Sequence, residues 1–189
     1  MSFLRKTWEF VKVVVISLLI ILPIRYFIIQ PFYVKGASME PTFHDSEYLI
    51  INEIGYHFEE PKRGDIVVFR YPLDPQEYFI KRVIGLPGEK IDINNGKVFV
   101  YNDKHPNGIE LDESAYLDPS VKTYDLKEET ISVGSDQYFV MGDNRNNSKD
   151  SRTFGPVDKS FLTGKVWLRG WPVKRATAFG SQSYGMDRN

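Results

Sequence analysis

The chain has 189 residues, of which 42% are hydrophobic and 14% aromatic; it can therefore bury one sizeable core, and a disordered protein is excluded. Its 24 basic and 25 acidic residues are scattered and give a formal net charge of −1, so nucleic acid is not an expected partner. The absence of cysteine excludes disulfides and thiol catalysis. The three histidines, His44, His57 and His105, are scattered along the chain, and we expect no metal site and no cofactor.

A long apolar segment follows the basic N-terminus. The range 13–29 reads VVVISLLIILPIRYFII and carries a single charge, on Arg25. As a helix these residues would rise about 25 Å, slightly less than the roughly 30 Å hydrocarbon core of a bilayer. Snorkelling of Lys12 and Arg25 would make up the difference. We therefore predict that residues 1–30 form a cytoplasmic tail and a transmembrane anchor, with a kink at Pro23.

Two alternatives to an uncleaved anchor are a cleaved secretory signal and a helix buried in a soluble core. The flank IIQPFYVKGAS lacks a small-x-small pair at the usual distance for cleavage. Arg5, Lys6 and Lys12 favour a cytoplasmic N-terminus. The expected protein is thus a single-pass protein of the cell membrane, in contact with the lipid bilayer, and everything after Gln30 lies outside the cytoplasm.

Gly, Pro and Asn divide the remaining chain into short strand-like runs. Alternating polarity and many β-branched and aromatic residues favour strands over helices, and Asn95-Gly96 predicts a hairpin turn. We predict a mainly β fold, with an antiparallel β-sheet core over residues 31–172, a smaller inserted β and loop lobe at about 102–135, and a flexible tail at 173–189. The predicted strands lie in FYVKG, EYLIINEI, DIVVFRY, YFIKRVIGL, KIDINNGKVFVYN, QYFVMGD and GKVWLRGW.

One lysine in these runs has two apolar neighbours on its own face of a strand. In YFIKRVIGL, Phe79, Lys81 and Val83 point to the same side. Burial without a counterion would lower the pKa of Lys81 and favour the neutral amine, which is what a general base needs. A pKa near 7 corresponds to roughly 4 to 5 kcal/mol of differential interaction. The alternative is an edge-strand lysine whose amine reaches solvent.

Two further segments contain candidate catalytic groups. Ser38 lies in GASMEPT, where Pro41 marks a turn, and on local grounds it could be an ordinary loop serine. The polar loop GDNRNNSKDSRTFG at 142–155 follows an apolar run, and such a loop can place Asn, Asp and Ser side chains at a site. Within it, Asp150 and Arg152 are expected to form an ion pair that holds the loop.

Taken together, four segments in one order after an apolar N-terminus resemble the type I signal peptidases, which are membrane-bound Ser-Lys proteases. The segments are SMEPT at 38–42, RGDIVVF at 63–69, YFIKRVIGLPGE at 78–89 and GDNRNNSKDSRTFG at 142–155. The resemblance covers most of residues 10–170. It implies that residues 31–172 form an extracytoplasmic catalytic domain that removes signal peptides from exported pre-proteins.

The resemblance also implies a role for each matching residue. Ser38 matches the nucleophile, Lys81 the general base, and Ser148 the serine that hydrogen-bonds and orients the lysine amine. The backbone N–H of Ser38 is the natural first oxyanion donor. Some family members place a serine hydroxyl two residues before the nucleophile, but Gly36 stands there, so the hole would use backbone donors of the Gly36 region or water. Asp143, Asp150 and Arg152 match supporting positions.

Substrates of the family carry small residues at the first and third positions before the cut, as in Ala-x-Ala. An extended peptide beside the strands would direct alternate side chains into shallow pockets, for which Val34, Gly36, Phe79 and Val83 are candidate lining residues. The expected partners are secretory pre-proteins, the lipid bilayer and the protein-export translocon. Alternative hypotheses are a Ser-His hydrolase, a soluble self-cleaving repressor-type protein, and a catalytically inactive, membrane-tethered binding module of the same fold.

Overall fold

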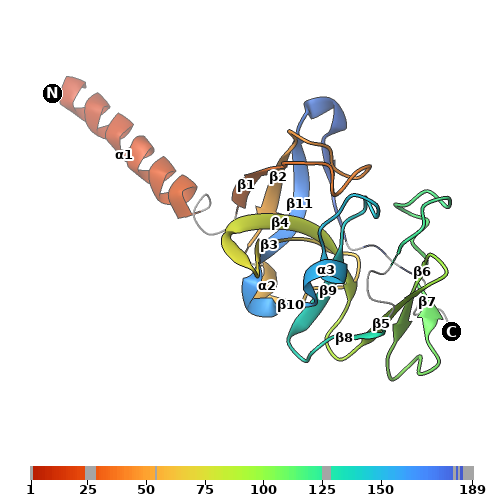
Figure 1. Cartoon of the computed structure of the whole chain (residues 1–189). Coiled ribbons are helices and arrows are strands. Elements are labelled where there is room, and N and C mark those ends of the chain that lie inside the picture. Colours follow the sequence, from red (N-terminus) through yellow and green to blue (C-terminus); the bar gives the residue numbers. More distant parts are fainter. Residues whose placement is uncertain are drawn as a thin grey trace.

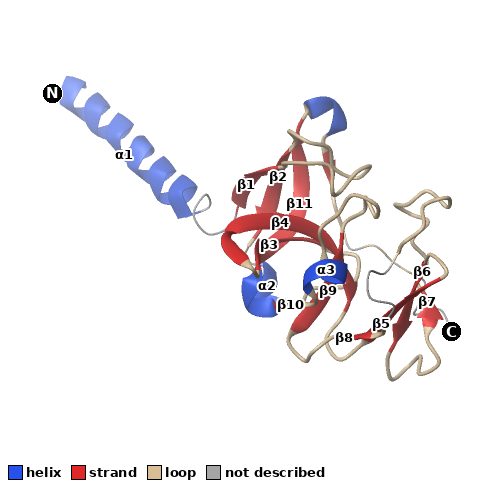
Figure 2. Cartoon of the chain, viewed as in Figure 1, coloured by secondary structure: helices blue, strands red, loops and turns tan. Residues whose placement is uncertain are grey.

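The structure is a computed structural model that describes residues 2–23, 29–53, 55–124, 129–180, 182 and 184. It is mainly β, as predicted, with one long N-terminal helix and two antiparallel sheets (Figure 1). Short helices and loops connect the strands (Figure 2). The short helical elements are α2 (Gly55–Phe58), α3 (Ser151–Phe154), η2 (Lys159–Phe161) and η3 (Val173–Arg175).

The N-terminal helix α1 (Ser2–Pro23) extends away from the sheets (Figure 1). Its apolar side chains are exposed, as at Phe10 (69%) and Leu19 (67%), so the helix is not part of a soluble core. None of the helices within the described ranges is both long and apolar enough to cross a membrane. Residues 24–28, which belong to the predicted anchor, lie outside the described residues.

The larger sheet has eight strands within the described residues, in the order β1-β2-β11-β3-β4-β9-β10, and β12 pairs with β11. Strand β3 is central, and its apolar run is buried on both faces: Ile66 and Val68 pack into one hydrophobic cluster, Val67 and Phe69 into another. The strands are β1 (Ile29–Tyr33), β2 (Tyr48–Asn52), β3 (Ile66–Tyr71), β4 (Asp74–Gly85), β9 (Gln137–Met141), β10 (Val157–Asp158), β11 (Leu162–Trp171) and β12 (Thr177–Ala178).

A second, four-stranded sheet forms the smaller lobe, in the order β7-β6-β5-β8. The predicted hairpin is present between β5 and β6, where Asn95 and Gly96 both have positive φ, 52° and 83°. The lobe therefore begins before the expected boundary at 102, because the first hairpin of the lobe precedes the polar segment. Its strands are β5 (Lys90–Asn94), β6 (Lys97–Tyr101), β7 (Ile109–Glu110) and β8 (Ile131–Ser132).

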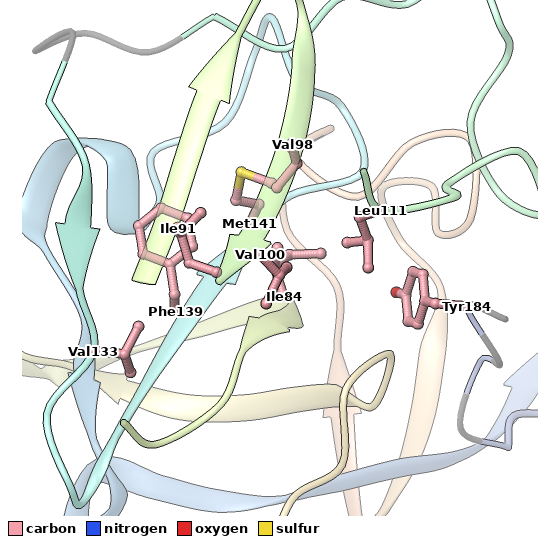
Figure 3. Packing of buried hydrophobic residues seen from close by; sticks show 9 residues of the cluster. All are labelled: Ile84, Ile91, Val98, Val100, Leu111, Val133, Phe139, Met141 and Tyr184. Atoms are coloured by element: carbon pink, nitrogen blue, oxygen red, sulfur yellow. The ribbon is translucent and has the colours of Figure 1, made fainter. Parts of the chain in front are cut away.

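A shared hydrophobic cluster connects the lobe to the larger sheet. Ile84 of β4 and Phe139 and Met141 of β9 pack against Ile91 and Val100 from the lobe (Figure 3). All five side chains are buried. The same cluster includes Val98, Leu111, Val133 and Tyr184. This continuous core holds β4, which carries Lys81, and β9, which leads into the polar loop, against the lobe.

The segment from residue 173, for which we predict a flexible tail, contains regular structure in its described part. The chain continues through η3 into β12, which pairs with β11. The Phe179 ring lies 4.7 Å from the ring of Phe43, and Tyr184 is buried in the cluster that joins the lobe to the sheet. These two aromatic side chains provide apolar contacts in a segment whose polar composition suggested disorder. Residues 181, 183 and 185–189 lie outside the described residues.

Candidate active site

Ser38 lies in the turn that leads from β1 towards β2. The turn is held by the core, because Met39 and Phe43, on the same turn, are buried in a cluster with Val34 and Leu49. The turn begins at Gly36, which has a φ of 85° and donates its N–H to Asp45 Oδ1 at 2.7 Å. A residue with a side chain would be strained at this φ.

Lys81 lies on β4 opposite Val67 of β3, and it is only 3% exposed. Its Nζ donates to Ser38 Oγ at 2.7 Å and to the Ile80 carbonyl at 2.8 Å. The alternative of an edge lysine whose amine reaches solvent is therefore wrong. The structure brings the two predicted catalytic groups, 43 positions apart in the sequence, into direct contact.

Burial lowers the pKa of Lys81 from its ordinary value of 10.5 to about 8, against the opposing attraction of Asp150 and Asp143. Among the described residues no carboxylate lies within ion-pair distance of this amine. Desolvation disfavours the ammonium because the buried site cannot replace its hydration shell. At pH 7, roughly a tenth of the molecules would carry a neutral amine.

Asp143 ties three segments of the site together. Its carboxylate accepts from Arg82 Nε at 2.8 Å and Nη2 at 2.6 Å, and both partners are almost fully buried. It also accepts from Thr42 Oγ1, on the nucleophile turn, at 2.5 Å. Arg82 in turn donates to the carbonyl of Gly64 at 3.1 Å. Such a bidentate, charge-assisted pair fixes geometry as well as charge.

The predicted pair of Asp150 and Arg152 is present, with both N–O distances at 2.8 Å. Asp150 also caps α3 and accepts from the backbone N–H of Gly142 at 3.0 Å. The pair thus holds the polar loop closed at both of its ends. At position 142, where the loop meets the nucleophile turn, the Cβ of any other residue would collide with Ser148 and with the Ser38 carbonyl. Only glycine fits there.

Ser148 lies next to this contact, but it does not make the hydrogen bond expected of it. Its Oγ is buried and has no hydrogen-bond partner among the described residues. The Lys81 amine is held instead by the Ile80 carbonyl and Ser38. Motif matching identified Ser148 correctly as a neighbour of the site, since it packs at Gly142, but backbone carbonyls cannot be recognised as partners from sequence.

Of the two backbone N–H groups expected to donate to the oxyanion, one has no protein acceptor among the described residues and the other is already hydrogen-bonded. Across the described part of the chain, no acceptor is recorded for the N–H of Ser38, so this donor is free to meet a developing charge. The N–H of Gly36, which the sequence included in the hole, is already bonded to Asp45. Gly36 therefore shapes the turn and does not offer a free donor.

A groove of about 590 Å³ opens beside Ser38 and Lys81. Val34 and Phe79, two of the four candidate substrate-binding residues, line it. Gly36 is not among its lining residues, and Val83 is fully buried beneath the sheet surface. Val83 shares the face of Lys81, but its side chain packs into a hydrophobic cluster with Val67, Tyr138 and Val140. Sequence reasoning missed other lining residues, among them Phe32, Tyr33, Tyr78, Ile80 and Lys149.

Two further residues of the polar loop were also missed. Asn144 contacts the nucleophile turn through its backbone N–H, which donates to the Ser38 carbonyl at 3.1 Å, and through its side-chain amide, which donates to the Ala37 carbonyl at 3.0 Å. Arg145 is buried and pairs with Glu113 of the lobe. Both residues stand inside the motif GDNR, but nothing in the local pattern distinguishes them from ordinary loop residues.

Comparison with known proteins identifies the family. The family model described as signal peptidase, peptidase S26, matches residues 7–171. A probable signal peptidase I-2 of Synechocystis sp. is 40% identical over 178 residues, covering 90% of this chain and 77% of the relative. A signal peptidase IB of Staphylococcus aureus is 34% identical over 184 residues, covering 89% of this chain and 91% of the relative.

Among solved structures, a signal peptidase I from Enterococcus faecalis is 29% identical and has a TM-score of 0.46, covering 57% of this chain and 97% of that chain. The family match spans the apolar N-terminal region, the nucleophile turn, the strand with the buried lysine and the polar loop. From the family model and the curated relatives we conclude that the chain belongs to the peptidase S26 family of signal peptidases.

Proposed function

We propose that this protein is a serine endopeptidase that removes N-terminal signal peptides from exported pre-proteins, with Ser38 as nucleophile and Lys81 as general base. The observation that carries the proposal is the 2.7 Å hydrogen bond between Lys81 Nζ and Ser38 Oγ in a site where the lysine is 3% exposed. A serine hydroxyl is a weak nucleophile at neutral pH, and a neutral amine at this distance can accept its proton.

In the proposed reaction, Ser38 Oγ attacks the scissile carbonyl while its proton passes to Lys81 Nζ. The resulting ammonium then protonates the leaving amine as the tetrahedral intermediate collapses to an acyl-enzyme. Water, deprotonated by the neutral amine of Lys81, attacks the ester to form a second tetrahedral intermediate. As that intermediate collapses, the bond to Ser38 Oγ breaks, the Lys81 ammonium returns its proton to Ser38 Oγ, and the signal peptide is released with a new carboxyl end. Proton transfers balance in each half of the cycle, and Lys81 returns to its neutral state.

The charge that develops on the carbonyl oxygen needs hydrogen-bond donors that are already in place. The free N–H of Ser38 supplies the first of these in the proposed mechanism. Asp143, Asp150 and Arg152 do not touch the dyad directly; they hold the polar loop and the nucleophile turn together through the buried ion pairs. The Ile80 carbonyl, at 2.8 Å from Nζ, takes the orienting role.

The groove favours an extended peptide as substrate. It runs between the segment of Phe32 to Lys35 and the segment of Gln76 to Lys81, and an extended chain between two strand-like segments can use their backbone groups. Val34 is buried and Phe79 is half-buried, and both contribute apolar surface to the groove. Small side chains such as Ala at alternate positions before the cut would fit such a surface.

We further propose that α1, together with the residues that follow it, anchors the protein in the cell membrane with a cytoplasmic N-terminus. The exposed apolar side chains of α1 support this proposal, as does the position of Lys12 beside Trp8, with Nζ 5.7 Å from the ring, a pairing typical of a membrane interface. Tethering would raise the effective concentration of membrane-bound precursors at the site, and the export translocon is the expected neighbour.

The catalytic assignment predicts that Ser38→Ala and Lys81→Ala each abolish cleavage of a precursor with an Ala-x-Ala site. The loss should exceed about a thousandfold, because each change removes one half of a unit that acts together. Detergent-solubilised wild-type and variant proteins would be compared on one secretory precursor by gel mobility. Leu73→Ala, at a side chain 73% exposed, serves as the control. Near-normal activity of Lys81→Ala would show that another group is the base.

The pH dependence of kcat/KM should report the lowered pKa of Lys81. Because the neutral amine is the active form, the rate should rise with pH and level off above a midpoint close to 8. Initial rates on an Ala-x-Ala peptide between pH 5 and pH 10 would measure it. A midpoint near the value of free lysine would contradict the desolvated amine.

The same shift should make Lys81 costly for stability. The unfolded chain binds its proton up to 10.5 but the folded chain only up to about 8, so below pH 8 the folded state carries a penalty of about 3 kcal/mol, which disappears as pH rises to 10.5. Lys81→Met should therefore raise the free energy of unfolding at pH 7 and lose that advantage by pH 10.5. Urea denaturation at both pH values would test it; a variant less stable at pH 7 would contradict the prediction.

The anchor proposal predicts that the full chain sediments with membranes and resists extraction by alkaline carbonate. A chain that lacks residues 1–30 should be released into the soluble fraction. Soluble behaviour of the full chain after cell lysis would contradict membrane anchoring, without bearing on the catalytic assignment.

A further inference from the structure

Asn144 is the one residue of the polar loop that contacts both peptide groups flanking the nucleophile. Its side-chain Nδ2 donates to the carbonyl of Ala37 at 3.0 Å. Its backbone N–H donates to the carbonyl of Ser38 at 3.1 Å. The two bonds hold the peptide group before Ser38 and the one after it, so residue 38 is held on both sides from one point.

The first of these bonds has a consequence for the oxyanion hole. The Ala37 carbonyl and the Ser38 N–H belong to the same planar trans peptide group, and they point in opposite directions. A hydrogen bond that fixes the direction of the carbonyl therefore fixes the direction of the N–H. The N–H of Glu40 also donates to the Ala37 carbonyl, at 3.1 Å, which gives this oxygen two donors.

The bond also changes the strength of the donor. An amide whose oxygen accepts hydrogen bonds is polarised, and its N–H becomes a stronger donor. This gain is largest when the N–H meets a full negative charge, which is the case in the tetrahedral intermediate and not in the bound substrate. Within the described residues the Ser38 N–H has no protein acceptor, so no protein group competes with the oxyanion for this donor.

Asn144 is itself held rigidly. Asp143 on one side is bonded to Arg82 and to Thr42. Arg145 on the other side is buried, pairs with Glu113 and donates to the Gly142 carbonyl at 3.0 Å. With both neighbours tied to buried partners, the side-chain amide of Asn144 does not need to be ordered during the reaction, which is the condition for preorganised stabilisation.

We propose that Asn144 is a positioning residue for the oxyanion hole, acting through the Ala37–Ser38 peptide group to aim and polarise the Ser38 N–H. The inference rests on the proposed role of Ser38 as nucleophile. It assigns a transition-state function to a side chain that touches neither the dyad nor the scissile bond. Removing it should lower kcat and leave KM unchanged, because the bond matters only once the oxyanion forms.

The test compares Asn144→Ala and Asn144→Asp with wild type. Both variants keep the backbone bond to the Ser38 carbonyl; Asp keeps the shape of Asn but offers a carboxylate oxygen where Nδ2 donates. We expect kcat to fall about 10- to 100-fold, since loss of an entire oxyanion donor costs about 100- to 1,000-fold. KM should stay within about twofold. Asn146→Ala is the matched control, because Asn146 is an exposed asparagine of the same loop.

Three readouts separate positioning from a structural role. Affinity for an Ala-x-Ala peptide boronic acid, which forms a tetrahedral adduct on serine, should fall by the same factor as kcat. Affinity for a matching Ala-x-Ala peptide that carries no boronic acid and cannot be cleaved should not change. In Asn144→Ala the midpoint of the pH profile should stay close to 8, because the burial of Lys81 is untouched and no carboxylate is added.

Unchanged kcat in both variants would overturn the proposal. So would a loss of activity in Asn144→Ala that comes with a shifted pH midpoint or a lower Tm, or unfolding of both variants, since each result would make Asn144 a support of the loop only. The Ser38→Ala variant distinguishes failure of the Asn144 proposal from failure of the proposed function. If that variant still cleaves or still forms the boronate adduct, Ser38 is not the nucleophile, and the fault lies in the proposed function.

Discussion

The contact between Lys81 Nζ and Ser38 Oγ depends on keeping water away from an amine that would normally be charged. Burial on β4 is what lowers its pKa, and the surrounding clusters of the larger sheet supply that burial. A desolvated lysine is destabilising below pH 8, so the site can exist only in a fold with a core large enough to tolerate it. The two hydrophobic clusters on either side of β3 supply that core.

The two carboxylates that attract the Lys81 ammonium are placed so that they do not cancel the lowering of its pKa by burial. Asp143 and Asp150 both raise the pKa of Lys81, and an unpaired carboxylate nearby would restore its ammonium. Each carboxylate is instead paired with its own arginine, Arg82 or Arg152. The arginine charge offsets the carboxylate charge at the lysine. Buried pairs of this kind add little net stability but fix a geometry, and here they connect β4, the nucleophile turn and the polar loop.

The smaller lobe takes part in this arrangement through the shared core and through Arg145. The Arg145 guanidinium crosses from the polar loop to Glu113 and also donates to Thr123 Oγ1 at 2.6 Å. A lobe that looked peripheral in the sequence thus supports the loop that holds the nucleophile turn. This supporting role follows from the contacts of Arg145 with Glu113 and Thr123 and could not be predicted from the polar composition of the lobe.

The β class and the hairpin at Asn95-Gly96 can be predicted from the sequence alone, and Ser38 and Lys81 can be proposed as the catalytic pair, because turn chemistry, alternation and motif order are local or linear properties. Alternation reports which face of a strand a side chain occupies, but not what covers that face. Alternation therefore predicts that Val83 shares the face of Lys81 but not that it is fully buried. The motif match in the same way predicts Ser148 near the site but not the hydrogen bonds of its hydroxyl. The burial of Lys81 and the bond from Asn144 to the peptide before Ser38 follow only from the folded structure, since both depend on chain segments that are far apart in sequence and meet when the core is packed. The contact of the amine with the neighbouring Ile80 carbonyl depends on the side-chain conformation that this burial imposes.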